Sequence, residues 1–189
     1  MKTCIIIHGG PLSLNEKSPH QLHTMYWLPW VKSELELKGI HTITPSMPNP
    51  WNCEYEEWKT EFEKYGVDEH SVLIGHSRGC AFLVRWLGET KVPTAKLIMV
   101  APNFVTKSDS KSIQDFYNFK IDESIKERVG ERIVFFSNTE DKDGTTSRNI
   151  ITTKLDCRVI ELPNHGHYIT EEMGGDAFPE LVEEVLKSI

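Results

Sequence analysis

Short apolar runs and amphipathic segments alternate along the chain. Six apolar runs bounded by turn-forming or charged residues are typical of buried strands, and they cover 3–7, 40–44, 71–74, 96–100, 133–136 and 158–162. Between them, apolar residues recur at helical spacing over 28–38, 54–65, 77–87, 146–155 and 177–188. The last segment is the clearest, because it places five apolar residues on one face: Phe178, Leu181, Val182, Val185 and Leu186.

This alternation predicts an α/β fold, namely a three-layer α/β/α sandwich around a mostly parallel six-stranded sheet. The aromatic-rich segment 103–121 shows neither period and is predicted to be irregular. The chain has 189 residues without repeats or linkers, so a single domain is expected over 1–189. In such sheets, functional residues gather in the loops beyond the carboxyl ends of the strands.

Composition narrows the functional classes. Hydrophobic content of 39% and charged content of 26% are ordinary for a soluble globular chain. The net charge of -7, with scattered Lys and Arg, argues against a nucleic-acid-binding surface. No apolar run approaches the ~20 residues that a membrane span needs. The strand predicted directly after the N-terminus leaves no room for a signal peptide, so a cytoplasmic location is expected.

The four cysteines support the same location. They lie far apart, without a Cys-x-x-Cys pair, at Cys4, Cys53, Cys80 and Cys157. Three of them fall in segments predicted to be buried and are interpreted as core thiols of a reducing compartment. Neither they nor the scattered histidines show metal-ligand spacing, so no metal is predicted.

The most informative segment is Gly-x-Ser-x-Gly at 75–79, which joins a predicted buried strand to a predicted helix. A serine at the apex of such a turn has an accessible hydroxyl. Chance produces such a pentapeptide in about one in twenty chains of this length, and the flanking strand and helix lower that figure several-fold. Ser77 is therefore the candidate nucleophile.

A serine nucleophile needs a base within hydrogen-bond reach, and in sheets of this kind the base follows the last strand. The loop after 158–162 contains both His165 and His167. His167 is favoured, because Gly166 gives the loop the freedom to bring the next side chain over Ser77. His165 is the alternative base or a support of the loop.

The acid that orients the base is expected after the strand 133–136. Three carboxylates compete in that loop, and Asp141 is favoured over Asp143 and Glu140. The oxyanion hole needs two backbone donors. The amide of Arg78, which follows the nucleophile, supplies one, and Gly10 in the loop after the first strand is the candidate for the other, since Pro11 has no N–H.

Several further residues have structural interpretations. His76 is interpreted as a turn residue. The tryptophans of the first third of the chain are expected mainly in the core, although some could wall an apolar acyl pocket near 45–53: Trp27, Trp30, Trp51 and Trp58.

A set of motifs spread over nearly the whole chain resembles one family. They are His8-Gly9-Gly10, Trp27-Leu28-Pro29-Trp30, Lys38-Gly39, Pro45-Ser46-Met47-Pro48-Asn49-Pro50 with Trp58 downstream, the 75–79 turn, and Gly166-His167-Tyr168. The chain resembles the small intracellular serine hydrolases of the α/β-hydrolase superfamily related to retinoblastoma-binding protein 9 and bacterial YdeN. The resemblance implies a serine triad, activity on small esters or amides, no cofactor and no large cap.

Two departures from the family pattern stand out. Relatives commonly carry paired aspartates before an apolar residue and proline. Residues 140–145 of this chain do not align with that pattern in a single way, so the choice of acid stays open. Relatives often carry a small residue where Arg78 places a cation at the mouth of the site. Arg78 therefore predicts a bias towards acidic or carboxylate-bearing substrates.

These observations lead to one principal functional hypothesis. The chain is predicted to be a serine hydrolase, carboxylesterase-like, that cleaves a small ester, thioester or amide with Ser77, His167 and Asp141 (or Asp143). The alternative is a hydrolase-fold protein-interaction module with weak or no catalysis. The substrate is expected to be a small molecule, and a protein partner is allowed but not indicated.

Overall fold

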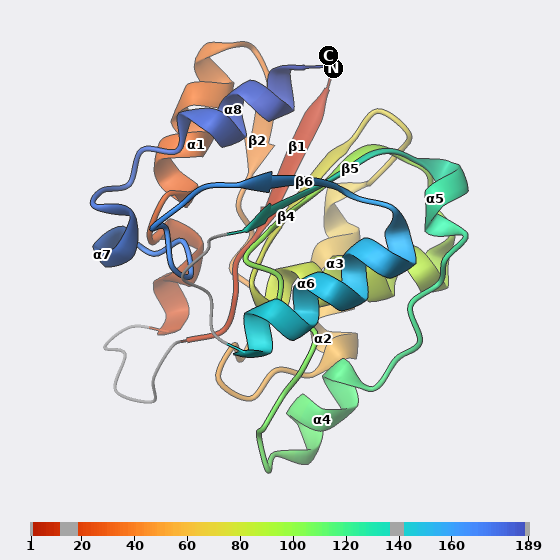
Figure 1. Cartoon of the computed structure of the whole chain (residues 1–189). Helices are drawn as coiled ribbons and strands as arrows, with labels where there is room; N and C mark the ends of the chain where they lie inside the picture. The colour runs from red at the N-terminus through yellow and green to blue at the C-terminus, as the bar shows by residue number, and fades with distance from the viewer. Residues whose placement is uncertain (1, 12–18, 137–141, 188–189) are drawn as a thin grey trace.

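The computed structural model describes residues 2–11, 19–136 and 142–187. Six parallel strands form one sheet in the order β2-β1-β3-β4-β5-β6 (Figure 1). The strands are β1 (Thr3–Ile7), β2 (His41–Ile43), β3 (Val72–His76), β4 (Thr94–Val100), β5 (Val129–Phe136) and β6 (Arg158–Glu161). The predicted fold class is therefore confirmed.

Helices cover both faces of the sheet (Figure 1). They are α1 (Leu28–Leu37), α2 (Tyr55–Phe62), α3 (Arg78–Thr90), α4 (Lys111–Tyr117), α5 (Ile125–Arg128), α6 (Lys142–Leu155), α7 (Thr170–Met173) and α8 (Pro179–Leu186), with short 3-10 helices at Pro19–Thr24 and Glu63–Tyr65. The prediction that 103–121 is irregular was wrong over α4. Its buried Ile113 and Phe116 lie three residues apart and pack in the core shared with α2 and α3, so packing stabilises a helix too short to show a period.

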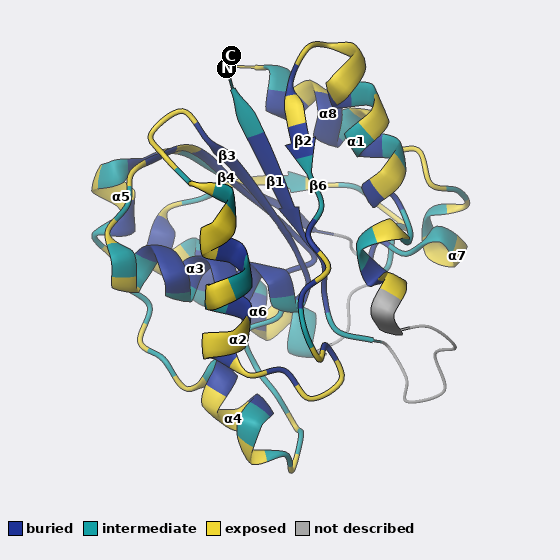
Figure 2. Ribbon diagram, turned by 180° about the vertical axis from the view of Figure 1, so that it is seen from behind, coloured by how far each residue is buried: buried dark blue, intermediate teal, exposed yellow. Residues whose placement is uncertain are grey.

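The strands divide their side chains between two cores, because successive residues of a strand point to opposite faces. One core contains the side chains that face α2 to α6: Ile5, Ile7, Leu73, Leu97, Met99, Val134 and Phe136. The other contains those that face α1 and α8: Cys4, Ile6, Val72, Ile74, Ile98, Val100, Ile133 and Phe135. The central strands are therefore buried on both faces, as Figure 2 shows for β1 and β3.

The two central strands β1 and β3 are neighbours whose connections leave in opposite directions. The chain passes from β1 to α1 on one face, and from β3 to α3 on the other. The loops that follow these strands therefore diverge, and the carboxyl ends of β1 and β3 lie at a topological switch point. Residues 8–10 and Ser77 lie at this point.

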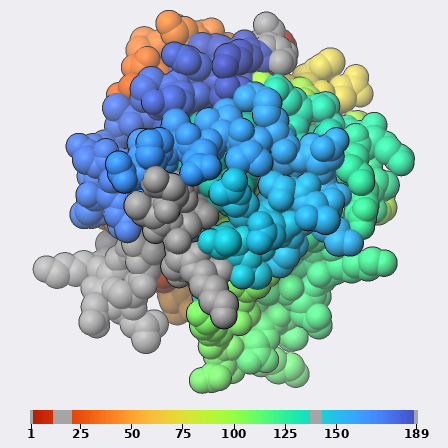
Figure 3. All heavy atoms as spheres, in the orientation of Figure 1, coloured from red at the N-terminus to blue at the C-terminus, as the bar shows by residue number. Residues whose placement is uncertain are grey.

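The C-terminal part of the chain closes one side of the molecule. In the space-filling view, residues from α6 onward, coloured cyan to dark blue, cover much of the front face (Figure 3). No helix among the described residues is long and apolar enough to cross a membrane.

Candidate active site

Ser77 occupies a strained turn between β3 and α3. Its φ of 52° and ψ of -116° lie outside the regions that residues with a side chain ordinarily adopt, at a cost of about 1–3 kcal/mol. Two backbone hydrogen bonds hold it there. The Ser77 N–H donates to the Val100 carbonyl at 2.9 Å, and the Ser77 carbonyl accepts from the Asn103 N–H at 3.2 Å. The end of β4 therefore fixes the serine.

The glycines on either side of Ser77 allow strand and helix to approach closely. A Cβ on Gly75 would lie 2.7 Å from the Cys80 nitrogen, in the first turn of α3. A Cβ on Gly79 would collide with the carbonyl oxygen of Ile7, at the end of β1. Any larger residue at either position would push α3 away from the sheet and displace Ser77.

The structure brings His167 to Ser77. The His167 Nε2 lies 2.8 Å from the Ser77 Oγ, within hydrogen-bond reach. His165, the alternative base, faces elsewhere: its Nδ1 donates to the Pro163 carbonyl at 2.8 Å. Of the two histidines in this loop, only His167 reaches the serine.

Tyr168 and Glu172, which follow His167 in the sequence, hold the histidine loop in place. The fully buried Tyr168 donates its hydroxyl to the Phe136 carbonyl at 2.6 Å and so ties the loop to the end of β5. The Glu172 carboxylate, in α7, accepts the His167 N–H and lies against Gly166. Glu172 therefore orients the backbone of His167 rather than its imidazole. Neither role was predicted from the sequence.

His76 forms a second link between the serine turn and the histidine loop. Its Nε2–H donates to the His167 carbonyl at 2.9 Å, and its ring packs edge-on against Trp27 with centroids 5.7 Å apart. Burial, and then the proximity of His167, lower the pKa of His76 to about 3, so its imidazole is neutral. From the sequence, His76 was predicted only as a turn residue.

The loop after β1 places its backbone beside Ser77. A Cβ on Gly9 would lie 2.9 Å from the Ser77 Cβ, so the 8–10 backbone borders the serine directly. His8 fixes this loop. Its Nδ1–H donates to the Gly9 carbonyl at 2.7 Å, and its Nε2 accepts the Met47 N–H at 3.0 Å. Burial lowers the pKa of His8 to about 4, which keeps the ring in the neutral form that this pairing requires.

The two backbone amides predicted for the oxyanion hole belong to residues close to Ser77 in the structure. Arg78 is the first residue of α3, where helix N–H groups have no partner within the helix and the helix dipole is positive. Gly10 follows Gly9 in the loop beside Ser77. These are the two amides that the sequence predicts as the oxyanion hole.

The proline-rich loop is held against the same edge. The Trp58 indole N–H donates to the Pro48 carbonyl at 2.7 Å. Trp58 and Trp27 are fully buried, in agreement with the core placement expected for them, whereas Trp51 is 36% exposed. In the same loop, the Pro50 carbonyl accepts a hydrogen bond from the Arg78 guanidinium.

The acid of the predicted triad is the least defined member. Asp141, which the sequence favours, and Glu140 lie outside the described residues. Asp143 is described, near the start of α6, and its carboxylate pairs with Lys107 at 2.5 Å. The choice of acid therefore stays a prediction. Among the described residues, no group of three His, Cys, Asp or Glu side chains could hold a metal ion.

Comparisons with known proteins place this arrangement in context. The profile of the family described as serine hydrolase matches residues 20–187. The crystal structure of the ydeN gene product from B. subtilis is similar over 100% of this chain and 98% of its own, with 23% identity and a TM-score of 0.85. None of the curated proteins compared with the chain matches it.

More distant structures share the fold at lower identity. A methylesterase protein from Arabidopsis has 10% identity and a TM-score of 0.67 over 99% of this chain and 98% of its own. A pyrethroid hydrolase from Sphingobium faniae has 11% identity and a TM-score of 0.64 over 99% of this chain and 97% of its own. At these identities the likeness shows the fold alone.

Proposed function

The chain belongs to the serine hydrolase family, and on this premise we propose that it cleaves a small ester, thioester or amide, with Ser77 as nucleophile and His167 as general base. The observation that carries the proposal is the 2.8 Å separation of the His167 Nε2 and the Ser77 Oγ. That separation allows direct proton transfer between the two groups. We include a carboxylesterase-like activity in the proposal, and the mechanism needs no cofactor.

Acylation follows from this geometry. As the Ser77 Oγ forms a bond to the substrate carbonyl carbon, its proton passes to the His167 Nε2, and the carbonyl electrons move onto the oxygen. The amides of Gly10 and Arg78 would donate to this oxyanion. Collapse of the tetrahedral intermediate breaks the bond to the leaving group, which takes the proton from His167 and departs as an alcohol, thiol or amine.

Deacylation repeats the sequence with water. Water adds to the acyl carbon and gives its proton to His167, and collapse of the second intermediate breaks the bond to the Ser77 Oγ. His167 returns the proton to the serine, and the carboxylic acid is released. Acylation and deacylation each begin with a neutral His167, which Asp141 (or Asp143) would orient through Nδ1.

The strained turn and its supports explain how the site is prepared for this chemistry. The hydrogen bonds of Ser77 to the Val100 carbonyl and from the Asn103 N–H hold the serine in its turn, and the hydrogen bond from His76 holds the backbone of His167. Both reacting side chains are thus positioned before substrate arrives, which lowers the entropic cost of reaching the transition state. The free cysteines agree with a reducing compartment, and we include a cytoplasmic location in the proposal.

The test is labelling and turnover with a matched pair of histidine variants. A fluorophosphonate probe is expected to label the wild type but not Ser77→Ala. With p-nitrophenyl acetate, butyrate and octanoate, kcat is expected to fall roughly 10⁴-fold or more in Ser77→Ala and His167→Ala. In His165→Ala, from the same loop, it is expected to stay within a few-fold of the wild-type value. If folded wild type is not labelled and cleaves no ester faster than Ser77→Ala, the proposal is wrong and the interaction-module alternative is favoured.

A further inference from the structure

The side chain of Arg78 lies directly on the loop proposed to bind the oxyanion. A Cβ built on Gly10 would come within 2.6 Å of the Arg78 Cζ, so the guanidinium rests against the Gly10 backbone. Arg78 also follows Ser77 in the sequence. A permanent positive charge therefore stands beside the backbone proposed to bind the oxyanion, in a residue that is half-buried rather than fully solvated.

The groups that hold this guanidinium are neutral. It donates to the Pro50 carbonyl and, through Nε, to the Tyr117 hydroxyl at 3.3 Å, and the Cys53 thiol is its third neighbour. Burial raises the pKa of the Cys53 thiol to about 11 and that of the Tyr117 phenol to about 12, so both are uncharged near neutral pH. Among the described residues, no carboxylate forms an ion pair with Arg78.

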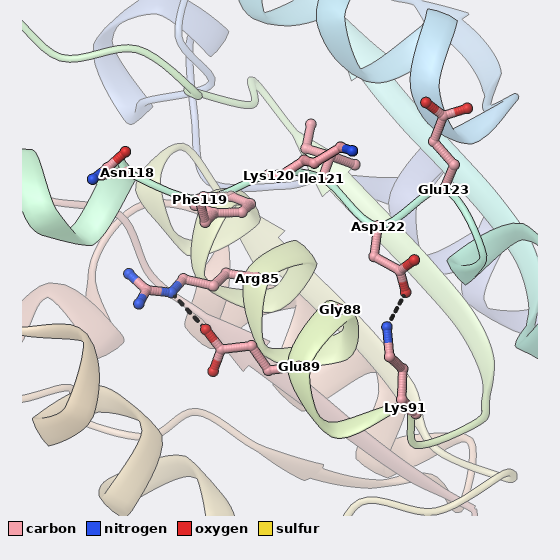
Figure 4. Close-up of a pocket in the computed structure, with 10 residues that line it drawn as sticks. All are labelled: Arg85, Gly88, Glu89, Lys91, Asn118, Phe119, Lys120, Ile121, Asp122 and Glu123. Carbon is pink, nitrogen blue, oxygen red and sulfur yellow. Dashed lines mark hydrogen bonds and ion pairs between the residues drawn. The ribbon is translucent and has the colours of Figure 1, made fainter.

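Arg85, a second arginine of α3, provides a comparison, because its guanidinium also contacts α4 but has a carboxylate partner. Its guanidinium donates to the Asp115 carbonyl of α4 at 2.8 Å, much as Arg78 reaches the hydroxyl of Tyr117 at the end of α4. Unlike Arg78, it pairs with a carboxylate, because Glu89 lies 2.9 Å from its Nε (Figure 4). Holding α4 therefore does not require an arginine without a counter-ion.

The cavity around Arg85 does not offer a comparable charge. It measures about 560 Å³ and lies between the second half of α3 and residues 118–123. Of the three cations that line it, Arg85 pairs with Glu89 and Lys91 pairs with Asp122 at 2.7 Å (Figure 4). The third, Lys120, is exposed to solvent rather than half-buried. Arg78, which forms no ion pair with a carboxylate among the described residues, lies instead beside Ser77, at the other end of the helix.

A half-buried cation without a counter-ion is costly, and an anion that reaches it is bound through charge-assisted hydrogen bonds. We propose that Arg78 binds a carboxylate located a few bonds from the scissile carbonyl, so that the site prefers anionic esters to neutral ones. This inference rests on the hydrolase activity proposed above and names the substrate class for it. It also gives the Arg78 side chain a role separate from that of its amide.

Matched esters test the preference. The p-nitrophenyl monoesters of glutaric and adipic acid carry a free carboxylate, and their methyl-capped diesters are neutral and nearly the same size. Rates measured with Ser77→Ala are subtracted to remove uncatalysed hydrolysis. For the wild type, kcat/KM is expected to be about tenfold or more higher for at least one anionic ester than for its capped partner, as a charge-assisted hydrogen bond in a half-buried site allows.

Variants of the two arginines assign the preference. In Arg78→Gln the anionic-to-neutral ratio is expected to fall to about one, mainly through a higher KM for the anionic ester, and Arg78→Lys is expected to retain part of it. Arg85→Gln is the matched control and is expected to keep the wild-type ratio. Because the ratio is taken within each variant, a general loss of activity from a displaced loop cancels.

The outcomes separate this inference from the proposed function. Wild type that cleaves the neutral esters with a ratio near one overturns the anion site and leaves the hydrolase intact. A preference that survives in Arg78→Gln, or is lost equally in Arg85→Gln, overturns the assignment to Arg78. Absence of Ser77-dependent cleavage of every ester overturns the proposed function and this inference with it.

Discussion

Buried polar side chains lie at both edges of the central sheet, but ion pairs are found at one edge and neutral imidazoles at the other. At the edge formed by the amino ends of the strands, the buried Lys96 and Glu184 belong to one network of ion pairs. At the carboxyl edge, beside Ser77, two buried imidazoles are neutral and bond to backbone groups. The same sheet thus uses buried ion pairs for stability at one edge and two neutral imidazoles to hold the candidate site at the other.

Lys96 is the centre of the amino edge. Its side chain is only 2% exposed, pairs with Glu131 at 2.8 Å, and donates to the Glu184 carbonyl of α8 at 2.5 Å. Arg158 joins both carboxylates, contacting Glu131 at 3.0 Å and also Glu184. Although burial raises it, the pKa of Glu131 is lowered overall by Lys96 and Arg158, which keeps this carboxylate ionised. The network fastens α8 to β4, β5 and β6.

The carboxyl edge follows another rule. His8 and His76 each use a ring N–H to hold a backbone carbonyl, of Gly9 and His167 respectively, and burial lowers the pKa of both. Neutral supports add no charge next to His167, which must accept and release a proton during turnover. The two buried imidazoles near the reaction therefore position backbone groups without adding charge, and the cation at this edge is the half-buried Arg78.

The largest expected effect comes from breaking the amino edge. Lys96→Met is expected to lower the free energy of unfolding by about 3 kcal/mol, because Glu131 and the carbonyls of α8 would lose a buried cationic partner. Urea denaturation followed by circular dichroism measures it. The folded variant is expected to hydrolyse esters at the wild-type rate, since Lys96 lies at the edge opposite Ser77.

A surface ion pair provides the control for that substitution. Lys64 pairs with Glu61 at 2.5 Å but is 59% exposed, so Lys64→Met is expected to change the free energy of unfolding by no more than about 1 kcal/mol. Equal losses in the two variants, or a loss below 1 kcal/mol in Lys96→Met, would show that the buried network does not stabilise the amino edge.

The fold could be predicted because its signals are local. Each strand is a short apolar run, and in each long helix apolar residues recur at helical spacing, so the α/β alternation is visible without knowledge of the tertiary contacts. Ser77 and His167 are equally visible, because a motif and a position after the last strand mark them. Helix α4 was missed because its stability comes from packing against α2 and α3, which no pattern within seven residues reveals.

The supports of the site could not be predicted for a related reason. His76 bonds to the backbone of a residue 91 positions later, and Tyr168 to a carbonyl 32 positions earlier. A side chain that recognises a backbone carbonyl places no demand on the residue type of its partner, so the sequence holds no paired signal. The path of the Arg78 side chain over Gly10 likewise depends on the loop's final conformation.

A second prediction uses pH to sharpen the comparison. His8 and His76 have folded-state pKa values of about 4 and about 3, below the ordinary 6.5, so the unfolded chain binds more protons between these values. The contribution of these two histidines to the free energy of unfolding is therefore fully present above pH 6.5, and it is lost as the pH falls below that value towards their folded-state pKa values. Between pH 7 and pH 5, each histidine is expected to remove about 2 kcal/mol from the free energy of unfolding.

Denaturation at several pH values tests this, with one variant from each class of histidine. His76→Gln is expected to lose about half of the pH dependence between pH 7 and pH 5, because only His8 then contributes a depressed pKa. His70→Gln, at a side chain 69% exposed, is expected to leave the pH dependence as in wild type. A wild-type unfolding free energy that stays constant from pH 7 to pH 5 would contradict the neutral state assigned to the carboxyl edge.

The smallest expected effect concerns His76 as a positioning residue for His167. His76→Phe keeps the ring against Trp27 but removes the N–H that holds the His167 carbonyl, so kcat is expected to fall about tenfold while KM changes little. His76→Gln places an amide N–H near the original Nε2 and is expected to recover most of that loss. Steady-state kinetics on one ester, with each variant measured equally far below its own melting temperature, separates a positioning effect from a loss of stability. If both variants lose activity equally, or if KM rises instead of kcat falling, the hydrogen bond does not position His167 and His76 serves only to fill the core.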